Sequence, residues 1–350
     1  MAYTTIDNPF KFFNTVLYTG ANKSITGVNF QPDWVWIKER DSGYHAIFDS
    51  IRGVTKVLSS NVNVAESTQS DTLTAFGTDG FTLGADSANY VGGSSTSTVS
   101  WNWLAGGSAS SNSDGSITSS VSANTTAGFS IVSYTGTGSN ATVGHGLGVA
   151  PKWILVKSRD ASENWVVFHK SLNSSGAGTY IYLNTQAAAA GGGSNTSIFN
   201  NTAPTSSVFS IGTDGNINNS GDDYIAYCFA EIKGYSKVGS WKGRSNPFIY
   251  TGFSPSFILG KNATNASAYD WWIVDNKRDV INDNSTKFLR PNGSDAEQTA
   301  TSSPVSFLSN GFSLTSTEHT FNGDGQTMIF MAFAESPFVT AGTKAAGTAR

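Results

Sequence analysis

Short apolar runs recur along the whole chain and end at Gly, Ser, Asn or Asp. They are rich in aromatic and β-branched residues, as in Trp34-Val-Trp-Ile-Lys-Glu39 and Phe129-Ser-Ile-Val-Ser-Tyr134. Runs of this length and composition predict strands. The best helical candidate, Ala187 to Ala190, is broken at once by the glycines at 191–193. The pattern therefore predicts an all-β protein.

Turn signals separate the predicted strands. Thr78-Asp79-Gly80 and Thr213-Asp214-Gly215 each supply a glycine that tolerates positive φ, so we expect each to close a hairpin. Strands at short intervals between such turns indicate antiparallel β-sandwiches and not βαβ units.

Three copies of the tripeptide Tyr-Thr-Gly occur at an equal spacing of 116 residues (134 − 18 and 250 − 134), beginning at Tyr18, Tyr134 and Tyr250. Related segments follow in the same order. Pro32-Asp-Trp-Val-Trp-Ile-Lys38 returns as Pro151-Lys-Trp-Ile-Leu-Val-Lys157 and as Pro255-Ser-Phe-Ile-Leu-Gly-Lys261, and each copy closes on an aromatic strand. A segment repeated in this way is one structural unit. We therefore expect three tandem related antiparallel β-sandwich domains of the jelly-roll or lectin-like type, each with its own two-layer core.

The repeats also predict the domain boundaries, with sandwiches at residues 17–105, 128–234 and 248–339. The Gly/Ser-rich segment 106–127 is expected to be a flexible linker, and 235–247 a short linker with aromatic residues. Residues 1–16 precede the first repeat as an N-terminal arm, and residues 340–350 form a small polar C-terminal tail.

Composition excludes several classes of protein. The chain has 350 residues and a net charge of −4, with only 21 Lys and Arg, whereas nucleic-acid binding requires a basic patch. No apolar run approaches the roughly 20 residues that span a bilayer, so no membrane insertion is expected. The N-terminus has no basic region followed by an apolar stretch, and we expect synthesis in a cytoplasm without a signal peptide. The single cysteine, Cys228, rules out an internal disulfide and is expected to be buried in a strand.

Catalytic motifs are not found. The four histidines have no short metal-ligand spacing, and the chain has neither a Gly-x-Ser-x-Gly elbow nor a phosphate loop. His45 and His169 fall in equivalent strands, which favours a structural role. We expect no enzyme activity, no cofactor and no metal site, although Asp222-Asp223 could hold calcium if further oxygens converged on it.

Carboxylates need separate treatment, because paired acids hydrolyse glycosidic bonds. Most candidates lie at repeated positions, and they are Asp41, Asp49, Asp160, Asp275, Asp279, Glu231 and Glu335. Arg40 precedes Asp41, Arg159 precedes Asp160, and Arg278 precedes Asp279. Since adjacent residues of a strand point to opposite faces, we expect each arginine to pair with a group elsewhere and to anchor a loop.

Aromatic side chains offer another kind of site, because exposed Trp and Tyr can stack on sugar rings. The pairs Trp34/Trp36 and Trp101/Trp103 each share one strand face and are interpreted as core. Trp271 and Trp272 are consecutive, so one of them is expected to face outward. The candidate contacts to a partner or a glycan are Trp271, Trp272 and Trp241.

Several motifs together resemble virion proteins of marine tailed bacteriophages. They include Phe48-Asp-Ser-Ile-Arg-Gly53, Trp101-Asn-Trp103, Tyr224-Ile-Ala-Tyr-Cys-Phe-Ala-Glu231 and Met331-Ala-Phe-Ala-Glu-Ser-Pro-Phe-Val339, and they cover nearly the whole chain. The resemblance implies a structural, non-enzymatic protein of the particle, commonly a tail fibre or appendage that attaches to a host-surface glycan or outer-membrane receptor. It implies a virion location, contacts with other virion proteins and a homo-oligomer such as a trimer. It supplies no catalytic residues.

Two other functions stay open. A head decoration protein would stabilise the capsid shell, and a surface-polysaccharide hydrolase would require a non-repeated acidic pair in a cleft. For a virion protein, the arm at 1–16 is a candidate docking segment, with Phe10, Phe12 and Phe13 as its contact residues.

Overall fold

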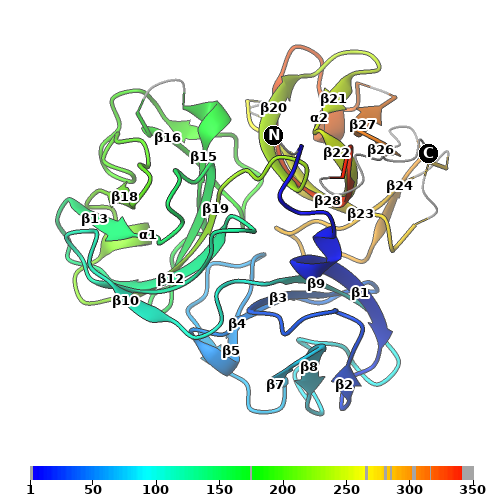
Figure 1. Cartoon of the computed structure of the whole chain (residues 1–350), viewed down its shortest axis with the longest axis horizontal. Coiled ribbons are helices and arrows are strands. Elements are labelled where there is room, and N and C mark those ends of the chain that lie inside the picture. Colours follow the sequence, from blue (N-terminus) through cyan, green and yellow to red (C-terminus); the bar gives the residue numbers. More distant parts are fainter. Residues whose placement is uncertain are drawn as a thin grey trace.

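The computed structural model describes residues 3–173, 176–264, 267–279, 282–283, 286–301, 305–315 and 317–340. Strands make up 44% of it and helices 4%, which confirms the all-β prediction. Figure 1 shows three lobes arranged around a common centre in chain order. The predicted C-terminal tail lies outside the described residues from 341 onward.

The first domain has a large and a small sheet. The large sheet has the order β1 (Phe13–Thr19), β9 (Ser97–Trp103), β3 (Trp34–Glu39), β4 (His45–Asp49), β5 (Gly53–Leu58) and β6 (Ser67–Thr68). The small sheet has the order β2 (Ser24–Ile25), β8 (Gly80–Leu83) and β7 (Leu73–Gly77).

The second domain repeats this plan with two additional strands at one edge of its large sheet. Its large sheet has the order β10 (Ser110–Asn112), β11 (Ser119–Asn124), β12 (Phe129–Thr135), β19 (Asp223–Phe229), β14 (Trp153–Ser158), β15 (Val166–His169), β16 (Thr179–Tyr182) and β17 (Ala190–Gly191). A two-stranded sheet of β13 (Ala141–Gly144) and β18 (Val208–Ile211), the helix α1 (Gly215–Asn218) and a 3₁₀ turn at Lys170–Leu172 complete the domain.

The third domain has a four-stranded sheet in the order β20 (Ser236–Lys242), β28 (Thr327–Pro337), β22 (Phe253–Asn262) and β23 (Trp272–Asp275). Two smaller sheets accompany it, β21 (Phe248–Tyr250) with β27 (Gly311–Leu314) and β26 (Val305–Leu308), and β24 (Thr286–Phe288) with β25 (Gln298–Ala300). The helix α2 (His319–Asn322) follows β27.

The three large sheets have four equivalent antiparallel strands in common. They are β1-β9-β3-β4, β12-β19-β14-β15 and β20-β28-β22-β23. This correspondence shows that the third Tyr-Thr-Gly is not the counterpart of the first two. Tyr18 and Tyr134 lie in β1 and β12, and the register places Trp241 of β20 at their position. Tyr250 lies in the small sheet, on β21, where it is 55% exposed.

Both segments expected to be linkers contain strands. Residues 106–127 include β10 and β11, which extend the second large sheet, and residues 235–247 include β20. The backbone groups of these Ser-rich segments are paired in the sheet, so neither is a flexible connection. The hairpin at Thr78-Asp79 is confirmed between β7 and β8. Thr213-Asp214-Gly215 is not a hairpin, because the Asp214 carboxylate accepts from the Asn216 amide and caps α1.

Six strands of the large sheets, β3, β4, β14, β15, β22 and β23, are buried on both faces. One face of each large sheet packs within its own domain, and the other joins a single cluster of aromatic and aliphatic residues from all three domains. Ring centroids bridge the domains at 4.6 Å for Trp34–Tyr227, 5.6 Å for Trp103–Phe333 and 5.9 Å for Phe229–Phe333. All six residues of β3 are therefore buried. The expectation of three separate cores was incomplete, because the domains also share one.

Candidate functional site

The predicted tryptophan contacts lie inside the protein. Trp271 and Trp272 are both 0% exposed, so the expectation that one of them faces outward is wrong. They do point to opposite faces of their strand, but Trp271 enters the shared central cluster and Trp272 enters the core of the third domain. Trp241 is partly buried against Phe312 and Phe330, and its indole N–H donates to Asn322 Oδ1 at 3.0 Å. None of the three offers an open platform for a sugar ring.

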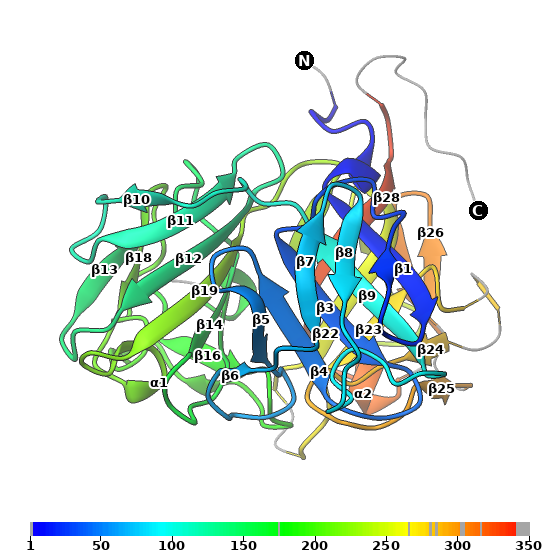
Figure 2. The same cartoon turned by 90° about the horizontal axis from the view of Figure 1, so that it is seen from below.

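The N-terminal arm also packs against the chain itself. Phe13 is the first residue of β1, is fully buried and stacks on Phe333 with centroids 5.1 Å apart. Phe12 contacts Tyr235 edge to face at 6.0 Å, and Phe10 is partly buried under Lys277. Figure 2 shows this segment beside β28, at the end of the molecule where β28 stops. Residues 3–13 therefore join the first domain to the third and do not form a free docking arm.

Equivalent residues of the three domains form one set of hydrogen bonds across the domain junctions. Trp165 Nε1 donates to the Ser59 carbonyl at 2.8 Å, and Trp271 Nε1 donates to the Tyr182 carbonyl at 2.9 Å. The first domain has a histidine at this position, and His45 Nε2 lies 3.0 Å from the Arg290 carbonyl.

The tautomer of His45 follows from its neighbours. Trp36 Nε1 donates to His45 Nδ1 at 2.8 Å, so the proton of a neutral ring must lie on Nε2 and point at the Arg290 carbonyl. Burial lowers the pKa of His45 well below its usual value, and the nearby Lys38 charge lowers it further. The ring is neutral and joins two domains, as expected for a structural histidine.

Ion pairs hold two of the three junctions. Arg52 pairs with Asp49 at 2.5 Å and with Glu66 at 3.1 Å in the first domain, and Arg159 of the second domain pairs with the same Glu66 at 3.0 Å. The Tyr227 hydroxyl of the second domain donates to Asp49 at 2.7 Å. This arrangement explains the Arg-Asp repeat, because Arg159 does pair with a group elsewhere.

The junction between the third and first domains is built in the same way. Arg278 pairs with Asp275 at 2.6 Å and with Glu297 at 3.0 Å, and Arg40 of the first domain reaches Glu297 at 2.6 Å. Trp101 Nε1 donates to Asp275 at 3.0 Å. Asp275, like Asp49, had been a candidate catalytic acid, and both are buried in ion pairs.

The junction between the second and third domains lacks these charges. His169, Leu172 and Ala189 occupy the positions of Asp49, Arg52 and Glu66, and Ala263 occupies the position of Arg159. The Ala189 amide still donates to the Ala263 carbonyl at 2.9 Å, as the Glu66 amide does to Arg159 at 2.8 Å. The backbone hydrogen bond is therefore present at all three junctions, whereas the ion pairs occur at only two of these junctions among the described residues.

Burial perturbs the ionisable groups of the junctions. Burial alone would raise the pKa of Glu66, but hydrogen bonds from Arg159 and the charge of Arg52 outweigh it and lower the pKa. Burial lowers the pKa of His169 to about 4. Three equivalent lysines, Lys38, Lys157 and Lys261, are fully buried, and burial lowers the pKa of each to about 8. Each donates to main-chain carbonyls, so perturbed groups here have structural partners.

A cavity of about 430 Å³ opens where the three domains meet. Its lining includes the equivalent residues Asn61, Asn184 and Asn292, whose Oδ1 atoms accept the main-chain N–H of His45, Trp165 and Trp271. We call it the axial cavity, because symmetry-equivalent residues of all three domains converge on it. Sequence reasoning missed these asparagines, since in a chain rich in Asn three isolated ones carry no signal until the strands are aligned.

Further polar groups from all three domains complete the axial cavity. Asp270 Oδ1 accepts from Asn292 Nδ2 at 2.7 Å and from Gln186 Nε2 at 2.8 Å, and Asp270 Oδ2 lies 3.3 Å from Arg290 Nε. Arg290 also pairs with Asp295 at 3.4 Å. Tyr44 of the first domain stands at the edge with 46% of its surface exposed.

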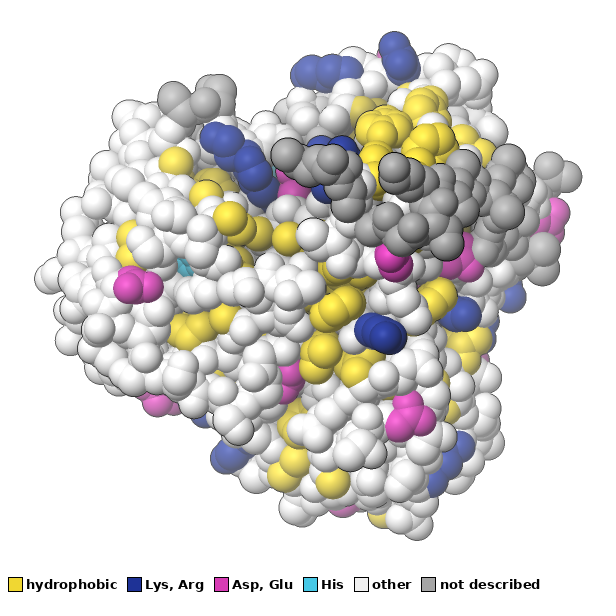
Figure 3. Space-filling model, in the orientation of Figure 1, with side chains coloured by type: hydrophobic (Ala, Val, Ile, Leu, Met, Phe, Trp, Pro, Cys, Tyr) yellow, Lys and Arg dark blue, Asp and Glu magenta, His cyan; other side chains and the backbone are white. Residues whose placement is uncertain are grey.

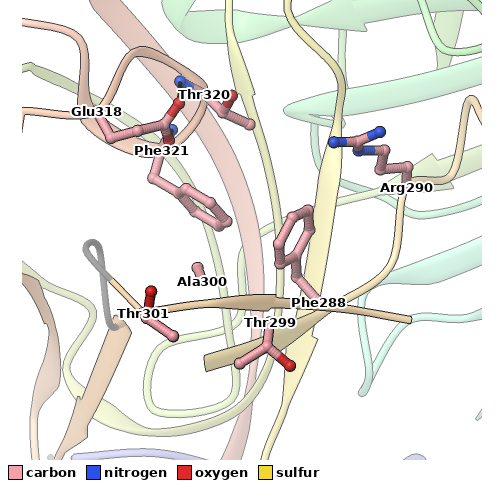
Figure 4. A pocket seen from close by; sticks show the side chains of 8 residues that line it. All are labelled: Phe288, Arg290, Thr299, Ala300, Thr301, Glu318, Thr320 and Phe321. Atoms are coloured by element: carbon pink, nitrogen blue, oxygen red, sulfur yellow. Dashed lines mark hydrogen bonds between the residues drawn. The ribbon is translucent and has the colours of Figure 1, made fainter. Parts of the chain in front are cut away.

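Arg290 also borders a second cavity, of about 220 Å³, within the third domain. Figure 4 shows the rings of Phe288 and Phe321 directed toward each other between Arg290 and Glu318, with Thr299 and Thr301 on the opposite side. The two rings meet edge to face with centroids 5.0 Å apart. Because Arg290 lines both spaces, it links the second cavity to the axial one.

A profile of the family described as "Domain of unknown function (DUF7483)" matches residues 8–337. The chain belongs to this family. The match begins in the N-terminal segment before β1 and ends in β28, so the DUF7483 unit is the complete three-domain ring and not one repeat. A search of the curated proteins gave no match.

On the face shown in Figure 3, uncharged polar side chains and backbone make up most of the surface of this DUF7483 protein. On the face shown in Figure 3, Lys and Arg side chains are scattered and do not gather into one basic patch. Among the described residues, no group of three or more His, Cys, Asp or Glu side chains could hold a metal ion. In the same part of the chain, no helix is long and apolar enough to cross a membrane. Cys228 is buried, as expected.

Proposed function

We propose that this DUF7483 protein is a non-enzymatic structural component of a tailed bacteriophage virion, in a tail fibre or similar appendage that attaches to the host surface. The observation that carries the proposal is that its buried acids form ion pairs and do not line an open site. Asp49 and Asp275 have side chains that are 0% exposed and pair with arginines that are also 0% exposed. Such acids cannot reach a substrate, and they join the domains instead.

The same construction suits a protein that works outside a cell without disulfides. A shared aromatic core and buried ion pairs hold the three domains as one body, and rigid elements position a binding surface better than flexible ones. The resemblance of its motifs to marine phage virion proteins supplies the biological setting. Other virion proteins are the proposed partners, and a homo-oligomer such as a trimer is the proposed assembly.

Labelling of purified phage particles with an antibody to this protein, followed by electron microscopy, tests the proposal. Signal at the tail or its fibres is the expected result. Signal distributed over the capsid in many copies would instead establish the alternative of a head decoration protein. Absence of the protein from purified particles would refute both.

A specific observation also keeps a hydrolase as a second candidate. Asp270 and Asp295 line the same axial cavity on either side of Arg290, which is the kind of non-repeated acidic pair that glycoside hydrolysis uses. Incubation of the protein with host surface polysaccharide tests this candidate. Release of oligosaccharide that is lost in Asp270→Asn would establish it, and intact polysaccharide would eliminate it.

A further inference from the structure

The axial cavity differs in one respect from strict threefold equivalence. In the second domain Asn184 Nδ2 donates to Asn164 Oδ1 at 2.8 Å, and in the third domain Asn292 Nδ2 donates to Asp270 Oδ1 at 2.7 Å. Tyr44 takes the place of Asn164 and Asp270 in the first domain. Within the described part of the chain, Asn61 Nδ2 therefore has no hydrogen-bond partner, although Asn61 Oδ1 is bound to the His45 amide at 3.0 Å.

The substitution places an exposed aromatic ring beside this open amide. Tyr44 is 46% exposed and lines the axial cavity, and its ring centroid lies 6.2 Å from that of Tyr90. A flat aromatic surface next to a hydrogen-bond donor suits a ligand with an apolar face and a polar rim.

Acceptors lie across the same cavity. The Asp295 carboxylate is 54% exposed and bonds to Arg290 at 3.4 Å, which leaves lone pairs for further donors. Asp270 is held in place by Asn292, Gln186 and Arg290. Two carboxylates against one guanidinium give these groups a formal charge of −1, which disfavours an anionic ligand.

We propose that the axial cavity binds a neutral saccharide unit. The C–H face of the sugar stacks on Tyr44, a ring oxygen or hydroxyl accepts from Asn61 Nδ2, and hydroxyl groups donate to Asp295. The volume of about 430 Å³ lies in the range of small-ligand sites. This inference names the ligand class for the host-surface contact proposed above, and its biological meaning rests on that proposal.

Saturation-transfer NMR on the full chain tests the site. The probes are D-glucose, D-galactose and N-acetyl-D-glucosamine, with D-glucuronate as the acidic counterpart of glucose. We expect transfer to the ring C–H protons of at least one neutral sugar and weaker transfer to glucuronate. Tyr44→Ala removes the stacking surface, and Asn61→Asp removes the donor while keeping an acceptor for the His45 amide. Each should weaken binding by about tenfold or more.

Tyr250→Ala is the matched control, because Tyr250 is also exposed but lies outside the axial cavity. Its binding should equal that of the unchanged protein. Lack of transfer to all three neutral sugars, stronger transfer to glucuronate, or full binding by both cavity variants would overturn the inference. Particle labelling is independent of this result, so a protein located on virions that binds no sugar loses the cavity proposal only. A sugar-binding protein absent from virions loses the proposed function only.

Discussion

Replacement of Arg52 by leucine tests whether the buried ion pairs hold the domains together. The Arg52 side chain is 0% exposed and bonds to Asp49, Glu66 and the carbonyl of Ile47. Leucine is the appropriate substitute, because Leu172 occupies the equivalent position in the second domain. The change leaves the Asp49 carboxylate, also 0% exposed, without its cation, and Glu66 with only Arg159.

The expected cost follows from this geometry. Removal of one partner of a buried ion pair costs about 3–5 kcal/mol, since the remaining charge stays desolvated. We therefore expect Arg52→Leu to lower the free energy of unfolding by about 4 kcal/mol. The double variant Asp49→Asn, Arg52→Leu removes the uncompensated Asp49 charge as well and leaves Glu66 paired with Arg159. It should recover most of the loss, because buried ion pairs are often replaceable by neutral groups.

Equilibrium unfolding in urea, followed by tryptophan fluorescence, measures both effects. Arg244→Leu is the control, because Arg244 is exposed and its substitution should change stability by no more than about 0.5 kcal/mol. The reasoning is refuted if Arg52→Leu matches that control. It is equally refuted if the double variant is as unstable as the single one.

Three further variants test other parts of the account. Burial lowers the pKa of His169 in the folded protein to about 4, whereas its pKa in the unfolded chain is near 6.5. The free energy of unfolding therefore falls by about 3 kcal/mol as the pH drops from 6.5 to about 4. His169→Gln should remove most of this pH dependence from the urea midpoint, and an unchanged pH profile would contradict this. Lys157 has a pKa of about 8 in the folded protein, against 10.5 for an exposed lysine, so the free energy of unfolding rises with pH between those values. In Lys157→Met, the rise of the melting temperature over this pH range should be smaller, and an equal rise would argue against the prediction. A Cβ at Gly260 would lie 2.1 Å from Cζ2 of Trp272, so Gly260→Ala should cost about 1–3 kcal/mol in urea unfolding, and a neutral effect would show that the indole can move.

The strand content could be read from the sequence because apolar runs such as β3 and β14 are bounded by turn residues. The burial of Trp34, Trp36, Trp101 and Trp103 also followed, since each pair shares one strand face. The outward placement of Trp271 or Trp272 failed for a physical reason. Alternation was correct, but β23 is buried on both faces, and strand periodicity cannot reveal a second core.

The junctions were only partly predictable. The Arg-Asp repeat indicated that Arg40 and Arg159 pair with distant groups, but their partners Glu297 and Glu66 lie in loops with no repeated motif. The axial asparagines were missed because their role depends on a neighbouring domain. The equal spacing of the tripeptides predicted the wrong counterpart in the third domain. The strand register aligns Tyr18 with Trp241 and not with Tyr250, so a different aromatic residue occupies the same place in the sheet.

The central claim is that the three domains form one cooperative body around a shared core. Differential scanning calorimetry tests it most directly, by comparing the van't Hoff enthalpy of unfolding with the calorimetric enthalpy of the full chain. We predict a single transition in which the two enthalpies agree. Three independent domains would instead give a van't Hoff enthalpy of about one third of the calorimetric value, and that result would contradict the claim.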